Sequence, residues 1–196
     1  MHLAFDIFQG IGISAAVGIR PFLPALIAGI LAAAGAEIHF NGTDFAFLQS
    51  VPFLIGMGVG GAALLIAERE LGRRAMATRS VVIVAAAFGL ALGALFFAGS
   101  LARGHYTDWP GFLGGVICAA VAVAATAPLL ARVSARLGDQ DASALPFYAE
   151  GAGILVGILS IVAPPVGLIA LLFLVWLLAA GRRREGQKYA GLRVLR

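Results

Sequence analysis

The stretch GIRPFLPALIAGILAAAG, residues 18–35, decides how this chain folds. It is apolar at both ends, yet it carries a permanent charge, Arg20, followed closely by two prolines, Pro21 and Pro24. Proline lacks a backbone donor and clashes with the preceding helical turn, so an apolar helix must break or bend here. The stretch therefore raises the question of what a charged helix break does in so apolar a chain.

The composition identifies the class of protein. Of the 196 residues, 61% are apolar and only 12% are charged, and that charged share is about half of what a soluble domain carries. The long apolar segments are 3–35, 49–67, 80–101, 111–131 and 147–181. Several approach the roughly 20 residues that span a bilayer. The sequence predicts an all-α polytopic membrane protein of about six transmembrane or half-membrane helices, with one domain over 1–181 and a basic tail over 182–196.

The positive charges are segregated along the chain and indicate its orientation. Arginines gather in the connections at 68–79 and 131–143 and in the tail, whereas the connections at 36–48 and 102–110 hold a single one, Arg103. An excess of Lys and Arg marks cytoplasmic loops. We expect a multi-pass protein of the bacterial inner membrane with a cytoplasmic C-terminus. The net charge of +4 then reflects orientation, and no nucleic-acid partner is expected.

A second helix break is required by this orientation. Residues 147–181 would begin and end on the cytoplasmic side, so the segment must turn back, and VAPPVG at 162–167 offers Pro164 and Pro165 for the turn. Each half has about 16 residues and would be about 24 Å long. The halves form either two short spans or a re-entrant hairpin.

The first apolar segment has a similar design. Residues 3–35 form either a hairpin, with Arg20 towards the cytoplasmic side, or one long kinked helix, with Arg20 near mid-membrane. Setting Pro21 against Pro164 puts Asp6 beside Glu150, and both segments then read acid, glycine-rich half, proline, apolar half. Paired broken helices indicate a transporter site. The alternative is that small-residue helices resemble one another by composition, and the sequence leaves open whether the repeats are inverted or parallel.

Glycines at helical spacing predict close helix packing. They form small-residue faces over 10–18, 56–60, 89–93 and 153–157. In lipid, such faces allow backbones to approach and gain van der Waals contact. The partners would be the lipid bilayer together with helices of the same chain, of a second copy, or of a larger membrane complex.

Four ionisable residues in or beside apolar segments are the candidate ion- or substrate-binding residues: Arg20, Glu68, Glu150 and Asp6. A charge at bilayer depth costs at least about 2.5 kcal/mol, so it is retained when paired, hydrated or functional. Arg20 beside a half-helix N-terminus would suit an anionic group. Alternatively, Arg20 snorkels from a hairpin tip or pairs with Asp6 or Glu68. The carboxylates are either ordinary helix-end residues or a proton or cation site.

Signatures of enzymes are missing from the sequence. The three histidines are scattered, and no pair of histidines or of histidine and glutamate has metal-binding spacing. No phosphate-binding glycine motif follows a strand pattern, and no nucleophile elbow occurs. We therefore expect no metal, no cofactor and no catalytic activity.

Three stretches carry a resemblance to a known family. They are GIRPFLPALIAGILA after Val17, LLIAERELGRR around Glu68, and VAPPVGLIALLFLVW with the tail YAGLRVLR. In these the chain is similar to a bacterial family of multi-pass membrane proteins, domain of unknown function 4126. The resemblance implies a small multi-pass protein and supplies no activity.

The sequence favours a small integral membrane transporter or channel, whose site lies between the two broken segments and takes a small ion or an anionic solute or headgroup. The first alternative is a non-catalytic subunit that packs in a larger membrane complex. A weaker alternative is a lipid-modifying membrane enzyme.

Overall fold

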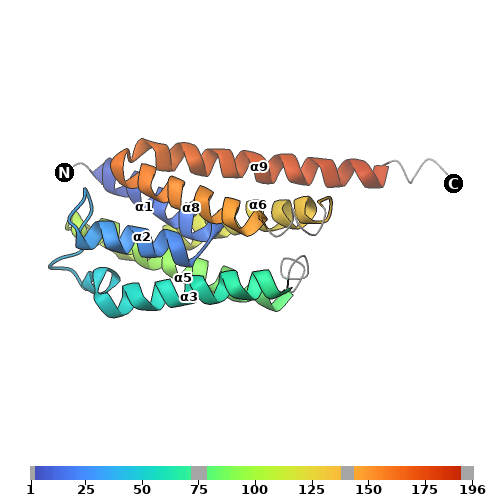
Figure 1. Cartoon of the computed structure of the whole chain (residues 1–196). Helices are drawn as coiled ribbons and strands as arrows, with labels where there is room; N and C mark the ends of the chain where they lie inside the picture. The colour runs from blue at the N-terminus through green and yellow to red at the C-terminus, as the bar shows by residue number, and fades with distance from the viewer. Residues whose placement is uncertain (1–2, 72–78, 138–143, 191–196) are drawn as a thin grey trace.

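The computed structural model describes residues 3–71, 79–137 and 144–190. Within these ranges the chain is all-helical, as predicted. The α-helices are α1 (Leu3–Ile19), α2 (Phe22–Ala33), α3 (Val51–Leu71), α5 (Arg79–Arg103), α6 (Trp109–Ser134), α8 (Leu145–Val162) and α9 (Pro165–Ala190), and a short 3-10 helix, η1 (Ala46–Gln49), precedes α3. The helices lie roughly parallel to one another in a single bundle (Figure 1).

Five of these helices are long and apolar enough to cross a membrane, and α1 and α2 are shorter apolar helices. Large apolar side chains cover the outside of the bundle: on α3, Val51, Ile55, Val59 and Ile66 are all at least 60% exposed. In a soluble protein such a surface would be polar, so its apolar character indicates contact with lipid. The chain is a membrane-embedded helical protein.

The first apolar segment forms a hairpin and not one long kinked helix. α1 ends at Ile19, the chain turns at Arg20 and Pro21, and α2 returns beside α1 (Figure 1). The return is shown by the Gln9 amide, which lies within 3.4 Å of the Glu37 carbonyl oxygen although 28 residues separate them. Pro24 does not break a helix: it lies in the first turn of α2, where a missing N–H costs no helical hydrogen bond.

The second proline break also forms a hairpin. α8 ends at Val162, and α9 begins at Pro165, a helix position that suits proline. α8 has 18 residues and α9 has 26, so they are about 27 and 39 Å long. They are therefore two long antiparallel helices, and α9 continues past residue 181 into the predicted tail.

The two hairpins point in opposite directions along the bundle. The tip of the first lies at Arg20, whose side chain meets Glu150 near the start of α8. The tip of the second lies at Ala163 and Pro164, and Gln9, near the start of α1, reaches the Ile161 carbonyl oxygen just before it. Each tip therefore lies near the base of the other hairpin. We refer to the two ends of the bundle as the Arg20 end and the Asp6 end.

α1 is the central helix and packs against α5, α6, α8 and α9. Glycines make this possible. A Cβ atom added to Gly12 would lie 2.6 Å from the Gly167 Cα atom, and one added to Gly18 would lie 2.6 Å from the Ala119 carbonyl oxygen. The predicted small-residue faces are thus used largely within the chain, while Gly56 faces open space. Association with a second copy or a larger complex stays a prediction.

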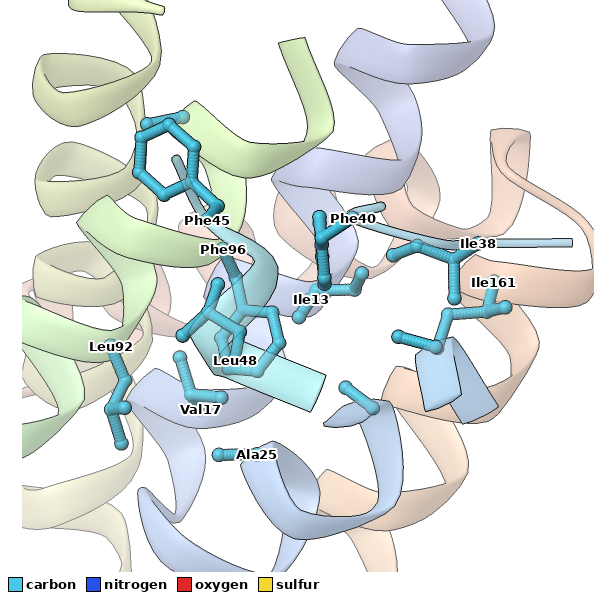
Figure 2. Close-up of a cluster of buried hydrophobic side chains, with 13 residues drawn as sticks. Ile13, Val17, Ala25, Ile38, Phe40, Phe45, Leu48, Leu92, Phe96 and Ile161 are labelled. Atoms are coloured by element: carbon cyan, nitrogen blue, oxygen red, sulfur yellow. The ribbon is translucent and has the colours of Figure 1, made fainter. Parts of the chain in front are cut away.

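α2 has only 12 residues and is about 18 Å long. The connection between α2 and α3, residues 34–50, therefore completes this side of the bundle. The apolar side chains of this connection turn inward between α1, α5 and α8. Figure 2 shows Phe40 and Leu48 of the connection near Phe96 and Ile13. Phe40 and Leu48 are fully buried. This connection closes the core at the Asp6 end with tightly packed apolar groups.

Candidate functional site

Three of the four predicted site residues come together at the Arg20 end. Arg20 is supplied by the hairpin tip, Glu68 by the last turns of α3, and Glu150 by the second turn of α8. All three are more than nine-tenths buried, with exposures of 5%, 7% and 3%. Arg20 therefore does not extend to lipid headgroups, although it lies at a hairpin tip. We call these three residues the Arg20 triad.

Arg20 has unequal contacts with the two carboxylates of the triad. Its NH1 nitrogen donates a hydrogen bond to Glu68 Oε1 at 2.5 Å. Its Nε nitrogen is 3.9 Å from Glu150 Oε1, within range of an ion pair but too far for a hydrogen bond. A charge-assisted bond therefore joins Arg20 to Glu68, while Glu150 receives only electrostatic attraction.

Many polar atoms of the triad lack a hydrogen-bond partner among the described residues. They are Arg20 Nε and NH2, Glu68 Oε2, and both carboxylate oxygens of Glu150. Buried polar groups are nearly always hydrogen-bonded, because each unpaired one costs about 1–3 kcal/mol. This concentration of unpaired donors and acceptors indicates that the triad has further partners, such as water or an ion.

A cavity of about 70 Å³ adjoins the triad. Arg20 and Glu68 contribute to its lining, and the other walls come from the end of α1, Pro21, the beginning of α5 and the second half of α6. Those walls are apolar apart from Thr126, whose hydroxyl donates to the Ala122 carbonyl oxygen at 2.7 Å. A cavity of this size has room for a few water molecules or a small ion.

The proline at 21 explains why Arg20 turns inward. Pro21 has no N–H to donate to the Val17 carbonyl oxygen. That oxygen instead lies against Gly89 of α5, and a Cβ atom added to Gly89 would be 2.9 Å from it. Pro24 packs against Gly153, where an added Cβ atom would be 2.9 Å from the Pro24 Cγ atom. The prolines thus end one helix, start another, and hold Arg20 between α1 and α8.

The fourth predicted residue, Asp6, lies at the opposite end of α1. It pairs there with Arg103, the last residue of α5, and not with Arg20. Arg103 also donates to the Glu37 carbonyl oxygen at 2.6 Å. Asp6 is 1% exposed. The structure therefore separates Asp6 from the Arg20 triad.

Gln9 and Arg103 are polar residues of this second cluster that sequence reasoning missed. Gln9 is 2% exposed, and its amide donates to the Ile161 carbonyl oxygen at 3.3 Å. Pro165 has no N–H to offer Ile161 four residues earlier, so Gln9 replaces the missing helical donor. A polar side chain in an apolar segment was the available signal for Gln9, and the only arginine of its connection was the signal for Arg103. We call Asp6, Gln9 and Arg103 the Asp6 cluster.

A cavity of about 260 Å³ lies beside this cluster, lined by Gln9, Arg103 and residues of the second hairpin tip. The two clusters lie near the two ends of α1, and 11 positions separate Gln9 from Arg20, or about 16 Å along a helix. Between them, Ile13, Ala16 and Val17 are fully buried. In this conformation, packed apolar side chains separate the two clusters.

The sequence profile of a family described as Domain of unknown function (DUF4126) matches residues 7–184. The chain belongs to this family. The matched range includes both hairpin tips and the whole Arg20 triad, which confirms the resemblance seen in the sequence. No curated protein and no solved structure shows significant similarity to the chain.

Proposed function

We propose that this DUF4126 protein is a small membrane transporter that carries a small cation through the Arg20 triad. The observation that carries the proposal is a buried cluster beside a cavity in which two carboxyl groups face one arginine. With both carboxylates ionised, Glu68 and Glu150 outweigh Arg20 by one charge, and the triad is more than nine-tenths buried. In that ionised state the site attracts a cation and repels an anion, so we favour a cation over the anionic ligand that Arg20 alone would suit.

The oppositely directed hairpins support transport. Transporters often place their site where broken helices from two inverted repeats meet, because the break frees backbone groups and charged ends inside the membrane. Here the tip of one hairpin carries Arg20 and the base of the other carries Glu150. A subunit that only packs against other proteins has no need of two buried carboxyl groups that share one arginine beside a cavity, which is why we place that alternative second.

The proposal also includes orientation. The Arg20 end is the end where α3 finishes and α5 begins, and the connection between them is rich in arginine. By the positive-inside rule this end faces the cytoplasm, in a bacterial inner membrane. The triad would then be open to the cytoplasm through its cavity and closed from the other side by the apolar middle of α1.

Ion uptake into proteoliposomes tests the proposal. Vesicles containing the purified full chain are given sodium, rubidium, chloride or phosphate one at a time, and the ion content is measured after filtration. We expect uptake of at least one of the two cations and of neither anion. Arg20→Ala and Arg20→Lys should both reduce uptake to that of protein-free vesicles, because lysine lacks the planar fork that can contact two carboxylates.

The matched control is Glu70→Gln, which removes an exposed carboxylate two residues from Glu68 and should leave uptake unchanged. Size-exclusion elution checks that every variant is folded. Uptake of anions only, or unchanged cation uptake in a folded Arg20 variant, would reject the triad as a cation site. Absence of uptake for all four ions would favour the packing-subunit alternative.

A further inference from the structure

The two carboxyl groups of the triad differ in how well their negative charge is neutralised by Arg20. Glu68 accepts a hydrogen bond of 2.5 Å from Arg20. Glu150 has no hydrogen-bond donor for either oxygen among the described residues, and it is only 3% exposed. An isolated carboxylate transferred to such surroundings takes up a proton, because a buried unpaired charge is far more costly than a neutral carboxyl group. One arginine neutralises one carboxylate, and that carboxylate is Glu68.

The charged groups that face Glu150 are few. They are Arg20, from the first hairpin, and Glu68, from α3. α2 carries no charged residue, and α9 carries none before Arg182, which is exposed. α1 has only Asp6, at the opposite end of the bundle, and Tyr148 of α8 itself is 76% exposed. No second cation among the described residues is therefore placed to compensate Glu150.

Arg20 is placed to change partners. Its Nε and NH2 nitrogens have no hydrogen-bond acceptor among the described residues, and Nε is already 3.9 Å from Glu150 Oε1. Glu68 lines the cavity, whereas Glu150 does not and is linked to it through Arg20. A cation that enters the cavity therefore meets Glu68 first and competes with Arg20 for it.

We propose that the protein exchanges the transported cation for a proton held on Glu150, with Arg20 as the switch between the two carboxylates. In the first state Arg20 pairs with Glu68 and the Glu150 carboxyl group is protonated. In the second, a monovalent cation binds Glu68, Arg20 turns to Glu150, and the O–H bond of Glu150 breaks as its proton passes to water. The site has zero net charge in both states, so the exchange is electrically neutral. This inference rests on the transport function proposed above.

Infrared difference spectroscopy tests the proton site without requiring transport. The full chain in lipid, first in N-methylglucamine buffer, is exchanged into sodium or rubidium buffer. We expect loss of the C=O absorption of a protonated carboxyl group when the cation binds. Glu150→Gln should lack that signal, and Glu70→Gln should retain it. The inference would be overturned if the wild type shows no loss of this C=O absorption on cation binding, or if Glu150→Gln still shows the loss.

Proteoliposomes loaded with a pH-sensitive dye test the coupling. With acid inside, adding the transported cation outside should raise the internal pH, and short-circuiting the membrane potential should not change the rate. Glu150→Gln should abolish this proton release. Cation uptake without proton release would overturn the exchange and leave the proposed transport function intact. Loss of the infrared signal on cation binding, without any uptake, would support the proton site and reject transport.

Discussion

Both ends of α1 adjoin buried arginine and carboxylate side chains, but the ratio of carboxylates to arginines differs between them. At the Asp6 end, one carboxylate pairs with one arginine, and Gln9 takes over a carbonyl group that Pro165 leaves without its helical donor. At the Arg20 end, two carboxylates share one arginine. Buried polar atoms without a hydrogen-bond partner among the described residues occur at both ends: five in the triad, and Asp6 Oδ2, Gln9 Oε1 and Arg103 Nε in the Asp6 cluster. The difference teaches that a buried ion pair at a helix break is not by itself a binding site. The two ends therefore differ in their ratio of carboxylates to arginines, and the proposed cation site rests on that ratio.

The strongest test of this comparison breaks the balanced pair. Asp6→Ala leaves Arg103 with no anion, and loss of one partner of a buried ion pair costs about 3–5 kcal/mol. The measurement is thermal or chemical unfolding in a fixed detergent. Asp44→Ala, which removes an exposed carboxylate, should change stability little.

If the Asp6 cluster only joins helices, an apolar pair should replace it. The double variant Asp6→Leu/Arg103→Met should recover most of the lost stability, since apolar replacements of buried pairs are often neutral or stabilising, and cation uptake should persist. A stable double variant without uptake would show that the Asp6 cluster takes part in transport, and the comparison between the two ends would fail.

The packed middle of α1 keeps the two ends apart, and a smaller loss of stability should follow from disturbing it. In Gly12→Ala the new methyl group would lie 2.0 Å from Ser160 Oγ and 2.6 Å from the Gly167 Cα atom. Overpacking of this kind costs about 1–3 kcal/mol. Gly56→Ala is the matched control, because nothing lies within 4 Å of its added Cβ atom. It should be neutral or slightly stabilising. Equal unfolding temperatures for the two variants would contradict the close packing of α1.

The smallest effect is expected from the amide that bridges the hairpins. Gln9→Ala leaves the Ile161 carbonyl oxygen without its side-chain donor, which is 3.3 Å away in the structure. The expected loss is about 1 kcal/mol, because long neutral hydrogen bonds contribute little. Gln9→Asn retains the amide on a shorter side chain and should cost a similar amount if reach matters. An unchanged free energy of unfolding in both variants would show that the hydrogen bond between Gln9 and Ile161 does not stabilise the Asp6 end.

Much of the fold could be predicted from the chain because apolar length and proline position are local signals. The breaks at Pro21 and at Pro164 and Pro165 followed from the missing N–H groups, and pairing of Arg20 with Glu68 was one of the stated alternatives. The partner of Asp6 could not be assigned, because Arg103 lies 97 positions away and was counted only as a charge in a connection. The direction of the hairpins depends on how α1 packs against α8, which the spacing of glycines does not reveal.

The central place of α1 has a consequence for how the protein is made. α1 is synthesised before all the helices that pack around it, and its neighbours α8 and α9 follow only after α2, α3, α5 and α6. Asp6 has no Arg103 to pair with until α5 is made, and Arg20 does not meet Glu150 until α8 is made. Before then, burying these charged side chains in the bilayer costs free energy, so contact with water or with transient partners is favoured. Insertion of individual helices can precede their association. Nascent chains that stop before α8 should therefore be inserted but incompletely assembled, and thus exposed to membrane quality control.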